Sequence, residues 1–103
     1  MFTLTLDQKV RNRDYMIRDM IDKLSEKGII IDDGEMRPYK DKGRHGETGL
    51  EFQGGVYVPK DMSKDAAKEI IETEISKQSF FYNTMVDDMK AETYLFIYFR
   101  IYI

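Results

Sequence analysis

The sequence contains no cysteine and only one histidine, His45. Without cysteine the chain can form neither disulfides nor thiolate metal sites, and it offers no thiol nucleophile. A structural zinc site needs several cysteine or histidine ligands, so the composition argues against one. We therefore expect a protein without a metal or another cofactor.

Long apolar segments are also missing. Residues 1–7 lack the basic start and the apolar stretch of a secretory signal, and the most apolar run, residues 94–103, is too short to cross a bilayer. The net charge of -3 gives no overall attraction to nucleic acid or to anionic lipid. These features predict a cytoplasmic protein that does not bind membranes.

The composition is that of one globular domain. The chain has 103 residues, of which 42% are hydrophobic and 34% charged, which argues against disorder. That length is enough to bury a core without disulfides. No internal period or low-complexity segment indicates a repeat architecture. We expect a single domain that spans residues 1–103.

The C-terminal run, residues 94–103, is rich in aromatic and β-branched residues and predicts a strand around which the rest of the fold is arranged. Alternate side chains of a strand lie on opposite faces of its sheet. One face is apolar and should pack on helices: Leu95, Ile97, Phe99, Ile101 and Ile103. The other face is aromatic with one cation: Tyr94, Phe96, Tyr98, Arg100 and Tyr102.

Two segments have helical spacing. In the first, residues 8–27, Asp7 is a candidate N-cap and the apolar residues are Val10, Ile17, Met20, Ile21 and Leu24. We interpret its basic residues Lys9, Arg11 and Arg13 as a solvated surface. The second helix begins after Asp61 or Ser63. Its spacing favours a continuation to about residue 90, although residues 79–86 also suit a strand.

The middle of the chain predicts short antiparallel strands. Asp33 and Gly34 suit a type I′ hairpin turn after residues 29–31, with a return strand that ends near Pro38. Residues 38–49 read as a loop. Residues 53–55 join the next apolar segments either as a second hairpin or as a glycine bulge within one strand. The predicted fold is therefore α+β, with these strands, the long C-terminal strand and two helices packed on one face.

The aromatic face of the C-terminal strand is the first candidate site: Tyr94, Phe96, Tyr98, Arg100 and Tyr102. Aromatic residues and arginine are concentrated at the centres of protein interfaces. The alternative is that other residues of the same chain cover this face. If it is an interface, the partner is another protein or a second copy of the chain, which could also pair along an open edge of the strand.

The second candidate site is the basic, glycine-rich loop, whose candidate ligands are Arg37, Lys40, Lys42, Arg44 and His45. Such a loop could bind the phosphates of a nucleotide or nucleic acid while tyrosines stack on the bases. It contains no phosphate-loop motif, and a solvated loop is the simpler interpretation. His45 and Glu47 could form an acid–base pair, but no second histidine or cysteine supports catalysis.

The sequence thus predicts a small non-enzymatic protein-binding module. An inhibitor or adaptor of the kind that phages and other mobile elements carry would fit its size. Nucleic-acid or nucleotide-phosphate binding through residues 37–45 is the alternative function.

Overall fold

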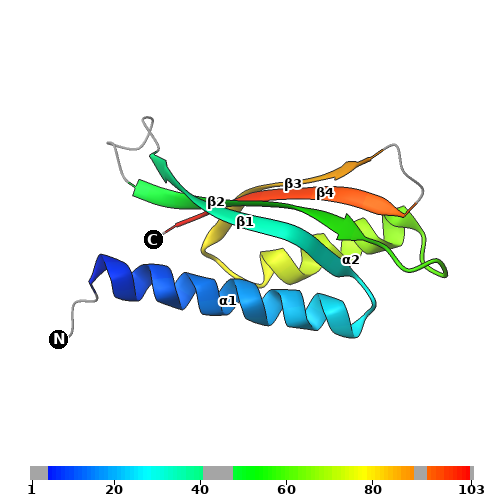
Figure 1. Cartoon of the computed structure of the whole chain (residues 1–103), viewed down its shortest axis with the longest axis horizontal. Coiled ribbons are helices and arrows are strands. Elements are labelled where there is room, and N and C mark those ends of the chain that lie inside the picture. The colour runs from blue at the N-terminus through cyan, green and yellow to red at the C-terminus, as the bar shows by residue number, and fades with distance from the viewer. Residues whose placement is uncertain (1–4, 41–47, 90–92, 103) are drawn as a thin grey trace.

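The computed structural model describes residues 5–40, 48–89 and 93–102 (Figure 1). The elements follow in the order α1 (Leu6–Glu26), β1 (Ile30–Lys40), β2 (Thr48–Tyr57), α2 (Lys64–Ser76), β3 (Phe81–Asp88) and β4 (Tyr94–Ile101). The strands form one antiparallel sheet in the order β1-β2-β4-β3, and both helices lie on the same side of it. This confirms the predicted α+β fold class. None of the described helices is both long and apolar enough to span a membrane.

Helix α1 has well-defined ends. Thr5, and not the predicted Asp7, is its N-cap, and it forms a capping box with Gln8. At the other end Gly28 has a φ of 82°, and the amides of Gly28 and Ile29 donate to the carbonyls of Ser25 and Leu24. This is a Schellman motif, and it needs a residue that tolerates a positive φ.

The predicted continuation of the second helix to residue 90 is wrong. Helix α2 begins after its N-cap Ser63 and ends at Ser76, and the chain then forms β3. Two residues of β3, Asn83 and Thr84, lie opposite the single residue Phe99 of β4, which makes a β-bulge. The bulge places Tyr82 and Met85 on the same face although they are three residues apart. Their three-residue separation therefore resembled the spacing of residues on one face of a helix.

The hairpin predicted at Asp33 and Gly34 is also wrong, because β1 continues through them. These two residues oppose the single residue Gly54 of β2, so they form a second bulge. A Cβ atom on Gly34 would lie 2.6 Å from Cζ of Phe52, which explains why glycine occupies this position. The dipeptide that resembled a turn is therefore a local irregularity of a longer strand.

The strands of the middle segment are longer than predicted. Strand β1 extends through Pro38 to Lys40, so the predicted loop at residues 38–49 loses three residues to β1 and two to β2. Strand β2 runs without interruption through residues 53–55, so both readings of that segment, a second hairpin and a bulge in this strand, are wrong. The bulge lies in the facing strand instead.

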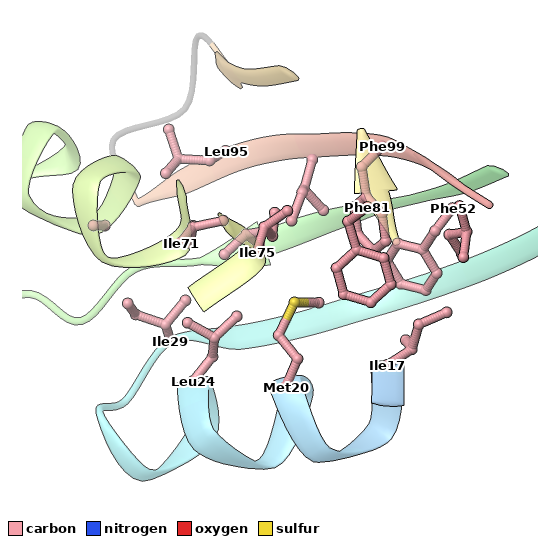
Figure 2. Close-up of a cluster of buried hydrophobic side chains, with 14 of the residues drawn as sticks. Ile17, Met20, Leu24, Ile29, Phe52, Ile71, Ile75, Phe81, Leu95 and Phe99 are labelled. Carbon is pink, nitrogen blue, oxygen red and sulfur yellow. The ribbon is translucent and has the colours of Figure 1, made fainter. Parts of the chain in front are cut away.

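The core lies between the helices and the sheet (Figure 2). Ile17, Met20 and Leu24 of α1 point toward the sheet, and Ile71 and Ile75 of α2 meet it beside them. The predicted apolar face of β4 supplies four fully buried side chains: Leu95, Ile97, Phe99 and Ile101. The ring of Phe99 lies 5.2 Å from that of Phe52 and 4.8 Å from that of Phe81.

The chain consists of two similar halves. Each half is a helix followed by an antiparallel hairpin, α1-β1-β2 and then α2-β3-β4, and the inner strands β2 and β4 pair at the centre of the sheet. The bulge of β1 immediately precedes Glu35, which opposes Gln53 of β2. The bulge of β3 immediately precedes Met85, which opposes Tyr98 of β4. Gln53 and Tyr98 also pair with each other, so an approximate twofold axis passes between them, normal to the sheet.

Candidate interaction surface on the open face of the sheet

The side of the sheet turned away from both helices is the candidate site, and we call it the open face (Figure 1). Strand register and alternation place its side chains in three rows across the strands. The acidic row is Asp32, Gly55, Phe96 and Asp87. The middle row is Glu35, Gln53, Tyr98 and Met85. The arginine row is Arg37, Glu51, Arg100 and Tyr82. Ile30, Tyr57 and Tyr94 lie beyond the acidic row, and Tyr102 lies beyond the arginine row.

The five residues of the predicted aromatic surface all lie on this face. Tyr94, Phe96, Tyr98, Arg100 and Tyr102 are half-buried, whereas the alternating residues of β4 are buried under the helices. Neighbours in the sheet cover part of each ring, and no helix of the described chain crosses above them. Of the alternative prediction, that helix or sheet residues of the same chain cover this face, the sheet residues provide a partial cover, and none of the described helices contributes to it.

The aromatic rings are ordered by one another. The rings of Tyr57 and Tyr94 meet edge to face at 4.8 Å, and those of Tyr82 and Tyr102 stack at 4.0 Å. Tyr94 also lies directly over Gly55, whose missing side chain leaves the space for its ring. These contacts hold flat apolar rings in fixed positions, which reduces the entropy lost when a partner binds.

A polar network occupies the centre of the open face. The Tyr98 hydroxyl donates to Oε2 of Glu51 at 2.8 Å and accepts from Nε of Arg100 at 3.1 Å. Desolvation, together with the nearby Glu51 carboxylate, raises the pKa of Tyr98 above its usual value. The phenol therefore stays protonated and continues to donate, so the network stabilises one arrangement of the surface.

At the β1 edge Arg37 donates to Glu35 at 2.9 Å. This bond lowers the pKa of Glu35 and raises that of Arg37. Both side chains are about half exposed, so the pair contributes little to stability by itself. The ion pair instead holds the guanidinium of Arg37 on the open face.

Three apolar side chains of the open face are widely exposed. The exposed fractions are 44% for Ile30, 48% for Tyr57 and 50% for Met85. They come from three different strands. Sequence reasoning missed all three, because the pairing that brings their strands beside β4 joins residues far apart in the chain. The bulge in β3 also gave Met85 a spacing that resembles a helix.

The charges of this face are mainly negative. Its carboxylates are Asp32, Glu35, Glu51 and Asp87, and its cations are Arg37 and Arg100. Their distribution along the strands is uneven. The charged side chains of the acidic row are both carboxylates. Both guanidinium groups lie in the arginine row, on the other side of the middle row.

The predicted basic site is only partly described. Arg37 lies on the open face, bound to Glu35, and Lys40 is the last residue of β1. Lys42, Arg44 and His45 lie outside the described residues. The structure thus brings Arg37 into one row with Arg100, on either side of Glu51.

The prediction that the C-terminal strand offers an open edge is wrong. Strand β4 pairs with β2 on one side and β3 on the other, so the edges of the sheet are β1 and β3. Both edge strands carry a bulge, and β1 also contains Pro38, which has no amide to donate. These features hinder the addition of a further strand at either edge.

Within residues 5–40, 48–89 and 93–102, no three histidine, cysteine, aspartate or glutamate side chains are placed to hold a metal ion. Comparison with known proteins gave no match to a family model, to a curated protein or to a solved structure.

Proposed function

We propose that this chain is a non-enzymatic protein-binding module whose binding surface is the open face of its sheet. The observation that carries the proposal is the exposure of Ile30, Tyr57 and Met85 beside a pre-ordered set of tyrosines. An antiparallel sheet that faces water on one side normally carries polar residues there. Exposed apolar residues that share a face with aromatic rings and arginines are instead typical of protein interfaces.

Charge favours a protein partner over a nucleic acid. Nucleic-acid affinity comes mainly from lysine and arginine contacts to phosphates. The described side chains of the open face include four carboxylates and two guanidinium groups, and Arg37 is bound to Glu35. Such a face repels a phosphate backbone even though its tyrosines could stack on bases.

The proposed role is that of an inhibitor or adaptor. A module of this kind acts by occupying a surface, so it needs no catalytic group or cofactor. A cytoplasmic location and an origin in a phage or another mobile element are parts of the same proposal, based on the small size and the lack of cysteine.

Photocrosslinking tests the proposal. A benzoylphenylalanine residue replaces Tyr57 in one variant and Tyr15 in another; Tyr15 is 64% exposed on α1, in the helical layer. In cells that express the chain, we expect irradiation to give a discrete protein adduct from position 57 and none from position 15. The adduct should disappear when Met85→Lys is added and persist when Tyr15→Lys is added.

Two results would overturn this function. One is the absence of any adduct from position 57. The other is an adduct that forms equally at position 15 or that survives Met85→Lys in a chain with unchanged circular dichroism.

A further inference from the structure

We infer that the open face binds a second copy of this chain, so that two sheets pack face to face about a twofold axis. The inference rests on the proposed function and names the partner. Its basis is the distribution of charge and shape over the three rows of the open face. Under one particular rotation these rows give more contacts between opposite charges than between like charges.

Self-association along the sheet edges is hindered. The inner strands are paired on both sides, and the outer strands each have a bulge that interrupts their line of free backbone groups. A second copy must therefore approach the open face to bury its apolar residues. Packed sheets lie about 10 Å apart with their strands roughly aligned.

Two rotation axes in the plane of the interface keep the strands aligned, and charge distinguishes them. An axis parallel to the strands keeps each row over the same row, so that Asp32 of one copy faces Asp87 of the other. An axis along the middle row exchanges the acidic row with the arginine row. The first arrangement also places Glu51 over Arg100 of the other copy, but it brings Asp32 against Asp87 at both symmetry-related positions, and like charges within an interface are strongly disfavoured. In the second arrangement the like-charge contact is that of Glu35 with its own counterpart, and each Glu35 is bound to Arg37 of its own chain.

The second axis also gives favourable pairs along its length. Asp32 faces Arg37 of the other copy at both symmetry-related positions. Phe96 faces Arg100 of the other copy, which suits a guanidinium over an aromatic ring. On the axis Glu35, Gln53, Tyr98 and Met85 each meet their own counterparts. The two Glu35 carboxylates therefore meet at the β1 edge, beside the ion pairs of Asp32 with Arg37, whereas Tyr98 and Met85 meet on the other half of the face.

The size of the face is sufficient. Four strands about 4.8 Å apart, each about eight residues long at roughly 3.3 Å per residue, project over roughly 500 Å². The accessible surface of protruding side chains exceeds this projection. It is therefore comparable in scale with the roughly 800 Å² that each partner buries in a standard interface.

The test uses two charge reversals, Asp32→Arg and Arg37→Asp, with sedimentation equilibrium on the purified full-length chains. Each variant alone places like charges together at both symmetry-related contacts, so its dimer should dissociate with a Kd raised about tenfold or more. In an equimolar mixture both contacts join opposite charges. We therefore expect the two variants to form a heterodimer with an affinity close to that of the original homodimer.

Matched controls separate the interface from net charge. Asp22→Arg and Arg11→Asp change the charge by the same amounts at exposed positions of α1, in the other layer. We expect both control variants to dimerise like the original chain. Circular dichroism and the melting temperature of each variant verify that it is folded.

Three outcomes would overturn the inference: a monomeric original chain at concentrations up to roughly 100 µM, an Asp32→Arg variant that dimerises normally, or a mixture of the two variants that stays monomeric. The proposed function fails separately. A monomeric chain whose position 57 crosslinks to another protein loses the homodimer but keeps the binding module.

Discussion

At the scale of single residues, two charged side chains of the helical layer, Arg13 and Glu74, are buried in the described structure. Arg13 of α1 is only 9% exposed. Its Nε donates to the carbonyl of Tyr102 at 2.7 Å, and its guanidinium lies 3.5 Å from the ring centre of Phe80. We expected a solvated Arg13 from the sequence, which was wrong, because the folded chain brings the end of β4 beside this turn of α1.

Replacement of Arg13 by alanine should lower the free energy of unfolding by about 1–3 kcal/mol. The loss combines a cation–π contact with a carbonyl that loses its donor. Arg11→Ala is the control, because Arg11 is exposed on the same helix. Urea unfolding of the two variants measures the difference. Equal effects would show that the Arg13 contacts contribute nothing beyond helix propensity.

Glu74 of α2 is the second such residue. Its side chain is 5% exposed, and its Oε1 accepts from Lys77 at 2.9 Å and from Lys27 at 3.5 Å. The hydrogen bond from Lys77 is the main cause of a pKa below the usual glutamate value, and Lys27 adds to it. Because Lys27 follows α1, the carboxylate links the two helices.

The contribution of Glu74 should depend on pH. A carboxylate whose pKa is lower in the folded state stabilises the fold above its unfolded pKa, about 4.3, and loses this contribution as the pH falls through the folded value. The original chain should therefore be more stable than Glu74→Gln at pH 7, and the difference should shrink below about pH 4. Unfolding in urea at several pH values provides the measurement.

Glu72→Gln is the matched control for Glu74→Gln, because Glu72 is exposed on the same helix. We expect its effect on stability to be small throughout the acidic range. If the gap between the original chain and Glu74→Gln stayed constant from pH 7 to pH 3, the ion pairs of Glu74 would not be its cause.

At the scale of elements, the two bulges determine the shape of the sheet. A bulge adds a residue to one strand, increases the local twist and moves the following side chains to the opposite face. In β1 the extra residue allows Ile31 and Met36, five residues apart, to lie on the core side together. In β3 the bulge requires a φ of 51° at Asn83, a residue type that tolerates such values.

The glycines on the two sides of the sheet should differ in their response to substitution. Gly34→Ala directs a methyl group at the buried ring of Phe52 and should cost roughly 1–3 kcal/mol of stability through overpacking. Gly55→Ala meets the outer end of the partly exposed Tyr94 ring, which can move at the cost of its contact with Tyr57, so the loss should be under about 1 kcal/mol. Urea unfolding compares the two variants, and near-ultraviolet circular dichroism reports the movement of Tyr94. A larger loss for Gly55→Ala than for Gly34→Ala would contradict this account.

At the scale of the whole molecule, the number of layers explains why a surface is left for binding. Two helices cover one face of a four-stranded sheet, and the described chain supplies no third layer. The two helix–hairpin halves place the pair of Gln53 and Tyr98 near the centre of the uncovered face. Tertiary architecture therefore gathers aromatic residues from β2, β3 and β4 into one surface.

The sequence predicted part of this surface and missed the rest. The alternation of residues 94–102 correctly separated the buried Leu95, Ile97, Phe99 and Ile101 from the aromatic residues between them. It could not identify the neighbours of β4, because strand pairing joins residues far apart in the chain. Glu51, which binds Tyr98 across a separation of 47 residues, is an example.

The sequence by itself determined the fold class, the most apolar strand with its two faces, and two candidate caps for the second helix, of which Ser63 is the one used. These features depend on propensity, periodicity and capping, which are properties of neighbouring residues. The tertiary structure alone decided the strand order, the bulges at residues 33–34 and 83–84, the burial of Arg13 and the composition of the open face. Each of these depends on contacts such as that between Gly34 and Phe52, whose consequences appear only when distant segments pack together.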